Sequence, residues 1–86
     1  MMGTMPLKPI TPTNHARFEM RRRGIRSSEV ESVIRNPQQI VPSKKGRHIY
    51  QSRIAGGRLL LRVVVKEETS VYRAYKTSRV RKYWKS

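Results

Sequence analysis

The chain has 86 residues, with 20 lysines and arginines against 5 acidic residues, so its formal net charge is +15 at pH 7. All five acidic residues are glutamates and cysteine is absent. The carboxylate clusters that hold Mg²⁺ or Ca²⁺ and the thiolates that bind zinc are therefore excluded. We expect a protein that uses no metal and no other cofactor.

This positive charge predicts a polyanionic partner. Repulsion among the cations opposes compaction of the chain, so some anion has to offset it. Nucleic acid is the first candidate, because each phosphate that a protein neutralises releases condensed counterions. An acidic protein would neutralise the same charge, and that alternative stays open.

The length predicts one domain with a small core. Residues 1–12 contain Pro6, Pro9 and Pro12 and no apolar run of signal-peptide length. We expect a flexible N-terminal arm at residues 1–12 and a single α+β domain at residues 13–84. The longest apolar stretches are too short to span a membrane, so we expect a cytoplasmic protein without a membrane partner.

Two short helices are predicted first. Thr13 is an N-cap residue before a helix over Asn14–Arg23, and Gly24 is a typical stop. A second helix over Ser27–Asn36 is indicated by apolar residues at helical spacing, with a capping box formed by Ser28 and Glu31. The short connection predicts an αα-hairpin.

From residue 39 onward the apolar pattern changes to the alternation typical of strands. Gly56-Gly57 predicts a two-residue hairpin turn, and residues 67–69 predict another turn. The expected strands are Gln39–Val41, His48–Ile54, Arg58–Lys66 and Ser70–Thr77. The third is the most hydrophobic and is expected to be central, with Leu59, Leu61, Val63 and Val65 on one face and Leu60, Arg62, Val64 and Lys66 on the other. The resulting fold class is α+β, with an N-terminal αα-hairpin packed on one face of a three- to four-stranded antiparallel sheet.

Cations alternate with aromatic residues along these strands, which predicts a basic sheet face on the side away from the helices. Arginine and lysine bind phosphates and aromatic rings stack on unpaired bases, so this face suits single-stranded or looped RNA. The alternative is a solvated face whose cations serve only solubility. The candidate nucleic-acid-binding residues are Arg47, Arg53, Arg58, Arg73, Tyr75, Lys76 and Lys82.

The chain has two histidines, the residue type used most often for general acid–base catalysis. His15 lies in the first turn of the first predicted helix, where capping or packing is its expected role. His48 begins a strand beside Arg47 and Tyr50, and is a candidate general base for a ribose 2′-OH. Passive exposure at a basic strand edge is the alternative for His48.

Segments at both ends of the chain resemble a known family. The N-terminal segment is His15-Ala16, Met20, Arg23-Gly24-Ile25, the Val30/Val33/Ile34 helix and Asn36-Pro37, and the C-terminal one is Tyr75-x-Thr77-Ser78-Arg79-Val80-x-Lys82-Tyr83-Trp84. Together they resemble a family of small bacterial and archaeal domains of unknown function, thought to be related to the RelE/ParE toxin superfamily with its BrnT-like ribonucleases.

The resemblance implies a RelE/BrnT-like α+β fold, metal-free cleavage of RNA on the ribosome and an antitoxin partner. RelE-like ribonucleases use basic residues of the central sheet and a C-terminal tyrosine, and Arg62, Arg79 and Tyr83 occupy comparable places by topological analogy. The chain departs from the family pattern at Glu19, where relatives carry a basic residue, and at Arg79, where lysine is common.

The leading hypothesis is a toxin-like, metal-free endoribonuclease of a toxin–antitoxin system, acting on single-stranded or ribosome-bound RNA. Arg62 and Arg79 would stabilise the phosphate, and Tyr83 or His48 would transfer protons. The alternative is a non-catalytic module that binds nucleic acid or the ribosome. An acidic antitoxin protein is compatible with both.

Overall fold

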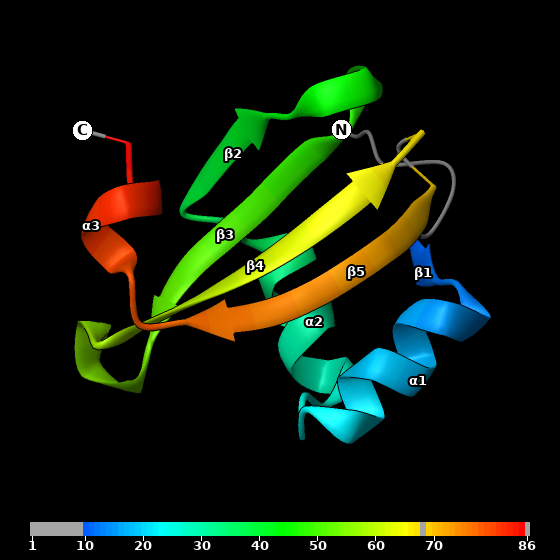
Figure 1. Cartoon of the computed structure of the whole chain (residues 1–86), viewed down its shortest axis with the longest axis horizontal. Coiled ribbons are helices and arrows are strands. Elements are labelled where there is room, and N and C mark those ends of the chain that lie inside the picture. The colour runs from blue at the N-terminus through cyan, green and yellow to red at the C-terminus, as the bar shows by residue number, and fades with distance from the viewer. Residues whose placement is uncertain (1–9, 68, 86) are drawn as a thin grey trace, which may run out of the picture.

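The computed structural model describes residues 10–67 and 69–85, which form two N-terminal helices packed on one face of a mixed, mostly antiparallel five-stranded sheet (Figure 1). A third, short helix follows the sheet. The elements in chain order are β1 (Thr11–Pro12), α1 (Asn14–Arg22), α2 (Ser27–Arg35), β2 (Gln39–Pro42), β3 (His48–Ile54), β4 (Leu59–Lys66), β5 (Ser70–Thr77) and α3 (Val80–Tyr83).

The sheet has the order β1-β5-β4-β3-β2. The expected antiparallel strands β2 to β5 are confirmed, but the strand number is corrected to five, because β1 pairs in parallel with the start of β5. The amides of Thr11 and Thr13 donate to the carbonyls of Thr69 and Val71 at 3.0 and 3.1 Å. Two residues are too few to show a strand period, so the sequence placed them in the arm; residues 1–9 lie outside the described residues.

The helix signals are confirmed for α1 and corrected for α2. The Thr13 hydroxyl accepts from the Ala16 amide at 3.1 Å, and Gly24 has a φ of 69°, as expected of a cap and a left-handed stop. In α2 the expected pairing of Ser28 with Glu31 is wrong, because the backbone of Arg26 donates to the Glu29 carboxylate at 2.8 Å. The helix begins at Ser27 as expected, but its capping pair lies two residues before the expected one.

The β3–β4 connection is longer than the expected two-residue turn. Ile54 pairs with Leu59, so residues 55–58 form the loop. Ala55, Gly56 and Gly57 have φ values of 54°, 68° and 88°, a left-handed run in which the two glycines carry no Cβ penalty. Arg58 therefore belongs to the loop and not to the strand, where the sequence placed it.

The core lies between the helices and the sheet. Leu61, Val63 and Val65 of β4 are buried against the helices, while Val64 faces the other way, into a small cluster with Val41 and Ile49. This alternation and the central position of β4 confirm the sequence prediction. No helix among the described residues is long and apolar enough to cross a membrane.

Candidate nucleic-acid interface

The sheet face opposite α1 and α2 carries a row of three polar side chains at its centre. Gln51 pairs with Arg62, and Arg62 pairs with Tyr75, across β3, β4 and β5. Residues directly opposite one another in antiparallel strands point to the same side of the sheet. Strand register therefore places an amide, a guanidinium and a phenol side by side.

Arg62 is the centre of this row, with only 6% of its surface exposed. Its Nε donates to Gln51 Oε1 at 2.8 Å, and its Nη1 donates to the Tyr75 hydroxyl at 2.7 Å. The ring of Tyr83 in α3 lies 4.0 Å from the guanidinium carbon. A cation–π contact of this kind stabilises a desolvated cation by about 2 kcal/mol.

The guanidinium of Arg62 lacks an anionic partner among residues 10–67 and 69–85. The ion pairs within that range join Arg22, Arg23 and Lys76 to Glu19 and Glu29. Leaving a buried charge without a partner costs roughly 3–5 kcal/mol, and the two hydrogen bonds and the cation–π contact of Arg62 offset a cost of this size. Arg62 is therefore a buried cation whose partners among the described residues are all neutral.

A glutamine network fastens α3 to the sheet beside this cation. The fully buried Gln51 amide donates to Gln39 Oε1 at 2.7 Å and to the Tyr83 carbonyl at 3.1 Å. Gln39 in turn exchanges hydrogen bonds with the backbone of Lys85. Because these bonds hold the backbone of α3, they also hold the Tyr83 ring against Arg62.

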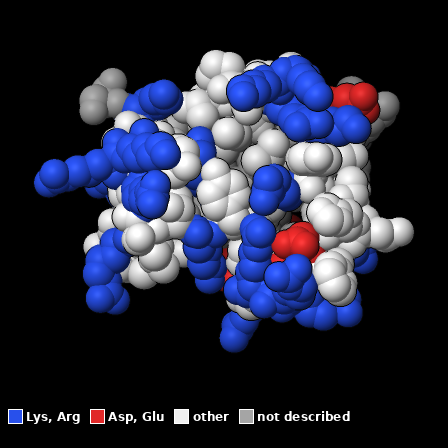
Figure 2. Space-filling model, in the orientation of Figure 1, with Lys and Arg blue, Asp and Glu red and all other residues white. Residues whose placement is uncertain are grey.

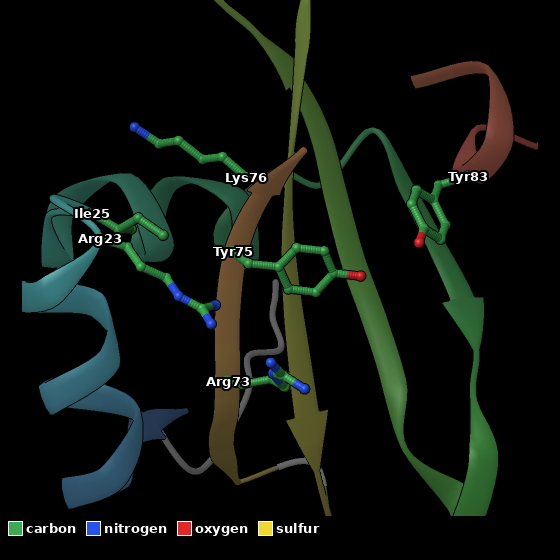
Figure 3. Close-up of a pocket in the computed structure, with 6 residues that line it drawn as sticks. All are labelled: Arg23, Ile25, Arg73, Tyr75, Lys76 and Tyr83. Atoms are coloured by element: carbon green, nitrogen blue, oxygen red, sulfur yellow. The ribbon is translucent and has the colours of Figure 1, made fainter. Parts of the chain in front are cut away.

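A pocket of about 640 Å³ lies between β5, α3 and the α1–α2 connection, and two of its lining residues, Tyr75 and Tyr83, contact Arg62. In Figure 3 the rings of Tyr75 and Tyr83 point toward one another over the sheet, with Arg73 beside Tyr75. Arg73 is exposed, and its guanidinium lies 5.7 Å from the Tyr75 ring. The lining residues are Arg23, Ile25, Arg73, Tyr75, Lys76 and Tyr83.

Two of the three cations in this pocket are already neutralised. Arg23 pairs with Glu19 at 3.2 Å and donates to the Ala74 carbonyl at 3.2 Å, and Lys76 pairs with Glu29 at 3.4 Å. Arg73 is therefore the pocket's cation that remains for a ligand within the described residues. Figure 2 shows Lys and Arg side chains around a largely neutral centre on this face.

The structure gathers part of the predicted site. Arg62, Arg73, Tyr75 and Tyr83 surround one region, as described above. Arg53, Arg58, Arg79 and Lys82 line a separate pocket at the β3–β4 loop. Arg47 lies at the far end of the sheet, 4.1 Å from the Tyr72 ring.

His48 and Lys76 lie on the helix side of the sheet. His48 pairs with Val65 and Lys76 with Leu61, and both partners belong to the core under the helices. Strand alternation therefore directs them away from Arg62. His48 is also three residues along β3 from Gln51, a distance of about 10 Å.

The sequence reasoning missed Gln39 and Gln51. Glutamine in a strand is ordinarily an exposed residue, so neither attracted attention. Strand alternation was the available signal, because it places Gln51 on the same side of β3 as Ile49 and Arg53. Its pairing with Arg62 depends on the length of the loop, which was mispredicted.

No cluster of three or more His, Asp, Glu or Cys side chains occurs within the part of the chain that the structure describes. Comparison with family models matches residues 13–75 to a domain of unknown function, DUF4258. No curated protein and no solved structure is significantly similar to the chain.

Proposed function

The chain belongs to the DUF4258 family, and we propose that it is a toxin-like endoribonuclease that cleaves single-stranded RNA without a metal ion. The observation that carries this proposal is the buried guanidinium of Arg62. The hydrogen bonds of the described residues use two of its five N–H donors. A phosphodiester bound here would offset the buried charge and accept the remaining donors.

The surroundings of Arg62 suit a strand with unpaired bases. Tyr75 and Tyr83 present aromatic rings, which stack on bases at roughly 1–3 kcal/mol each, and Arg73 offers an exposed cation for a neighbouring phosphate. Duplex DNA is disfavoured, because its major groove is read by a projecting helix or a two-stranded ribbon.

Tyr75 is the proton donor that this geometry favours. Its hydroxyl oxygen accepts from Arg62 Nη1, so its own hydrogen is directed elsewhere and is available to a ligand. In the reaction, the 2′ oxygen bonds to phosphorus as the bond to the 5′ oxygen breaks, leaving a 2′,3′-cyclic phosphate. The 2′-OH proton passes to solvent, Tyr75 protonates the leaving 5′ oxygen, and the phenolate recovers a proton from solvent.

This assignment changes the roles expected from the sequence for three residues. Tyr83 covers and orients Arg62 instead of donating the proton. His48 and Arg79 are left out of the catalytic centre, because one lies on the helix side and the other lines a different pocket.

The relation to RelE/ParE toxins is part of the proposal and rests on the sequence resemblance alone, since the family match covers residues 13–75 and not the C-terminal segment. It adds the expectation of a cytoplasmic protein whose target is ribosome-bound mRNA and whose basic face is covered by an acidic antitoxin. The net charge of +15 is compatible with such a partner.

Binding without cleavage is the second candidate. It is favoured by the position of His48, because the described residues then bring neither an imidazole nor a carboxylate to Arg62. The same face would still bind RNA through charge and stacking.

The test is incubation of 5′-labelled single-stranded RNA with the whole chain in EDTA, read on a sequencing gel. Cleavage by the wild type is expected to fall about 100-fold or more in Tyr75→Phe, the size of a general-acid contribution, and to stay near wild type in Tyr83→Phe. Arg73→Ala is expected to weaken RNA binding, whereas Arg17→Ala, which removes one charge from the helix side, serves as its control.

Circular dichroism of each variant separates a lost proton donor from lost folding. Full cleavage by Tyr75→Phe together with inactivity of Tyr83→Phe would transfer the acid role to Tyr83. RNA that stays intact with every protein, with and without ribosomes, yet shifts on a native gel would overturn the ribonuclease and leave the binding module.

A further inference from the structure

A second, strongly cationic pocket lies at the end of the sheet where the β3–β4 loop meets α3. It has a volume of about 650 Å³ and shares no lining residue with the pocket beside Arg62. We call it the loop pocket; its lining residues are Arg53, Gly57, Arg58, Ser78, Arg79, Val80, Arg81 and Lys82. Five of these eight residues are arginine or lysine and none is acidic.

None of the five cations takes part in an ion pair within residues 10–67 and 69–85. Elsewhere on the molecule glutamates neutralise Arg22, Arg23 and Lys76. Like charges placed around one pocket repel one another. A bound anion of high charge density would remove this repulsion.

Three of these residues are held by contacts that use at most one side-chain donor each. The Arg53 guanidinium lies 4.2 Å from the Trp84 ring, and Arg58 Nε donates to the Ala55 carbonyl at 3.4 Å. The backbone of Arg79 is fixed by its amide, which donates to the Thr77 hydroxyl at 3.1 Å. Such orientation lowers the entropy lost when an anion binds.

Helix α3 connects this pocket to the Arg62 centre. Tyr83 lines the pocket beside Arg62, while Arg81 and Lys82 from the same helix line the loop pocket. On the strand side, Tyr75 pairs with Arg62, and Thr77, two residues before Arg79, pairs with Leu60. A single strand of nucleic acid following α3 would therefore meet both. Figure 2 shows Lys and Arg side chains gathered over α3 and the neighbouring loop.

We infer that the loop pocket binds consecutive phosphates of the RNA strand, away from the phosphate at Arg62, and that Arg79 and Arg81 act in this binding and not in catalysis. This inference rests on the proposed function for the identity of the strand. Four of the five cations are arginines, whose planar forks match phosphate oxygens. Adjacent phosphates along one strand supply several closely spaced charges to one pocket.

The first experiment titrates tripolyphosphate into the whole chain by calorimetry in about 50 mM salt, near the low-salt regime where phosphate contacts are strong. The loop-pocket double variant Arg58→Ala/Arg79→Ala is compared with a control, Arg17→Ala/Arg35→Ala. The control removes the same charge from exposed positions on α1 and α2. At least a tenfold loss of affinity is expected only in the first. Equal losses in both would overturn the pocket in favour of diffuse attraction.

The second experiment measures the dissociation constant of a 12-nucleotide RNA against salt concentration. The slope of the logarithm of this constant against the logarithm of the salt concentration is expected to fall by about 1.4 in the loop-pocket variant. The variant removes two cations, and each phosphate contact contributes about 0.7 to the slope for single strands. The slope should be unchanged in the control. Competition by an octaglutamate peptide as strong as that by tripolyphosphate would overturn the phosphate assignment in favour of an acidic protein.

The two proposals fail separately. If the variant loses both tripolyphosphate affinity and salt slope while no protein cleaves RNA, the loop pocket stands and the ribonuclease does not. If RNA is cleaved but both double variants behave alike, the ribonuclease stands and the loop pocket does not.

Discussion

Glu29 is one of the few acidic residues in this basic chain, and it makes two stabilising contacts. Its carboxylate accepts from the Arg26 backbone at the start of α2 and pairs with Lys76 on β5. The hydrogen bond from the Arg26 backbone has the largest effect and lowers the pKa of Glu29; burial, the next largest, raises it, and the contact with Lys76 lowers it further. The residue thus joins a helix end to the sheet and neutralises a predicted RNA-binding lysine.

Because the folded state lowers the pKa of Glu29, its stabilisation is present above the ordinary glutamate value of about 4.3 and is lost as the pH falls through the lower, folded value. Glu29→Gln is expected to reduce the free energy of unfolding near pH 6, and this difference should vanish toward pH 3. Urea unfolding across that range measures it. Glu31→Gln, the same change on an exposed position of α2, is the control. A difference independent of pH would contradict the linkage.

At the scale of the elements, helix starts are decided by which side chain reaches an unpaired amide. Thr13 does so for α1, whereas α2 begins at Ser27 with Glu29 reaching back to Arg26. Ser28 has the same residue type preference as Thr13, but it lies inside the helix. Local spacing alone therefore placed the capping pair of α2 two residues too late.

Thr13→Ala is expected to lower the free energy of unfolding by about 1 kcal/mol, because the Ala16 amide loses its acceptor. Ser28→Ala is expected to change it by less than about 0.5 kcal/mol, since alanine is the better helix former. Chemical denaturation of the two variants in parallel measures both. A larger loss in Ser28→Ala than in Thr13→Ala would restore the capping box expected from the sequence.

For the whole molecule, charge is distributed unequally between the two sides of the fold. The ion pairs of the described residues involve Glu19 and Glu29, on or under the helices. The sheet face and the loop pocket carry cations without such partners in that range. Folding brings these cations close together, and their repulsion opposes folding. An anion that binds the folded state should therefore also stabilise it.

Raising NaCl from about 20 to 300 mM is expected to increase the melting temperature by several degrees, because salt screens the repulsion over a shorter Debye length. The double variant Arg17→Glu/Arg35→Glu reduces the net charge from +15 by four, to +11, and should show a weaker salt dependence. Thermal denaturation followed by circular dichroism measures both. A melting temperature that falls with salt in the wild type would contradict this account.

Features that depend on neighbours along the chain could be predicted from the sequence. Helical spacing and Thr13 predicted α1, alternation predicted the four longer strands, and the alternation in β4 assigned its two faces correctly. The polyanionic partner indicated by composition stays a prediction. The helix and strand predictions succeed because periodicity and capping are set within a few residues of chain.

The side-chain arrangement of the candidate site depends on pairing between distant segments and could not be predicted from the sequence. The β3–β4 register places Gln51 beside Arg62, and the β4–β5 register adds Tyr75 and turns Lys76 toward the helices. The docking of α3 then brings Tyr83 over Arg62 and divides the cations between two pockets. A register shift of one residue would send every side chain of a strand to the opposite face, and loop length and core packing, which act across the whole fold, select the register.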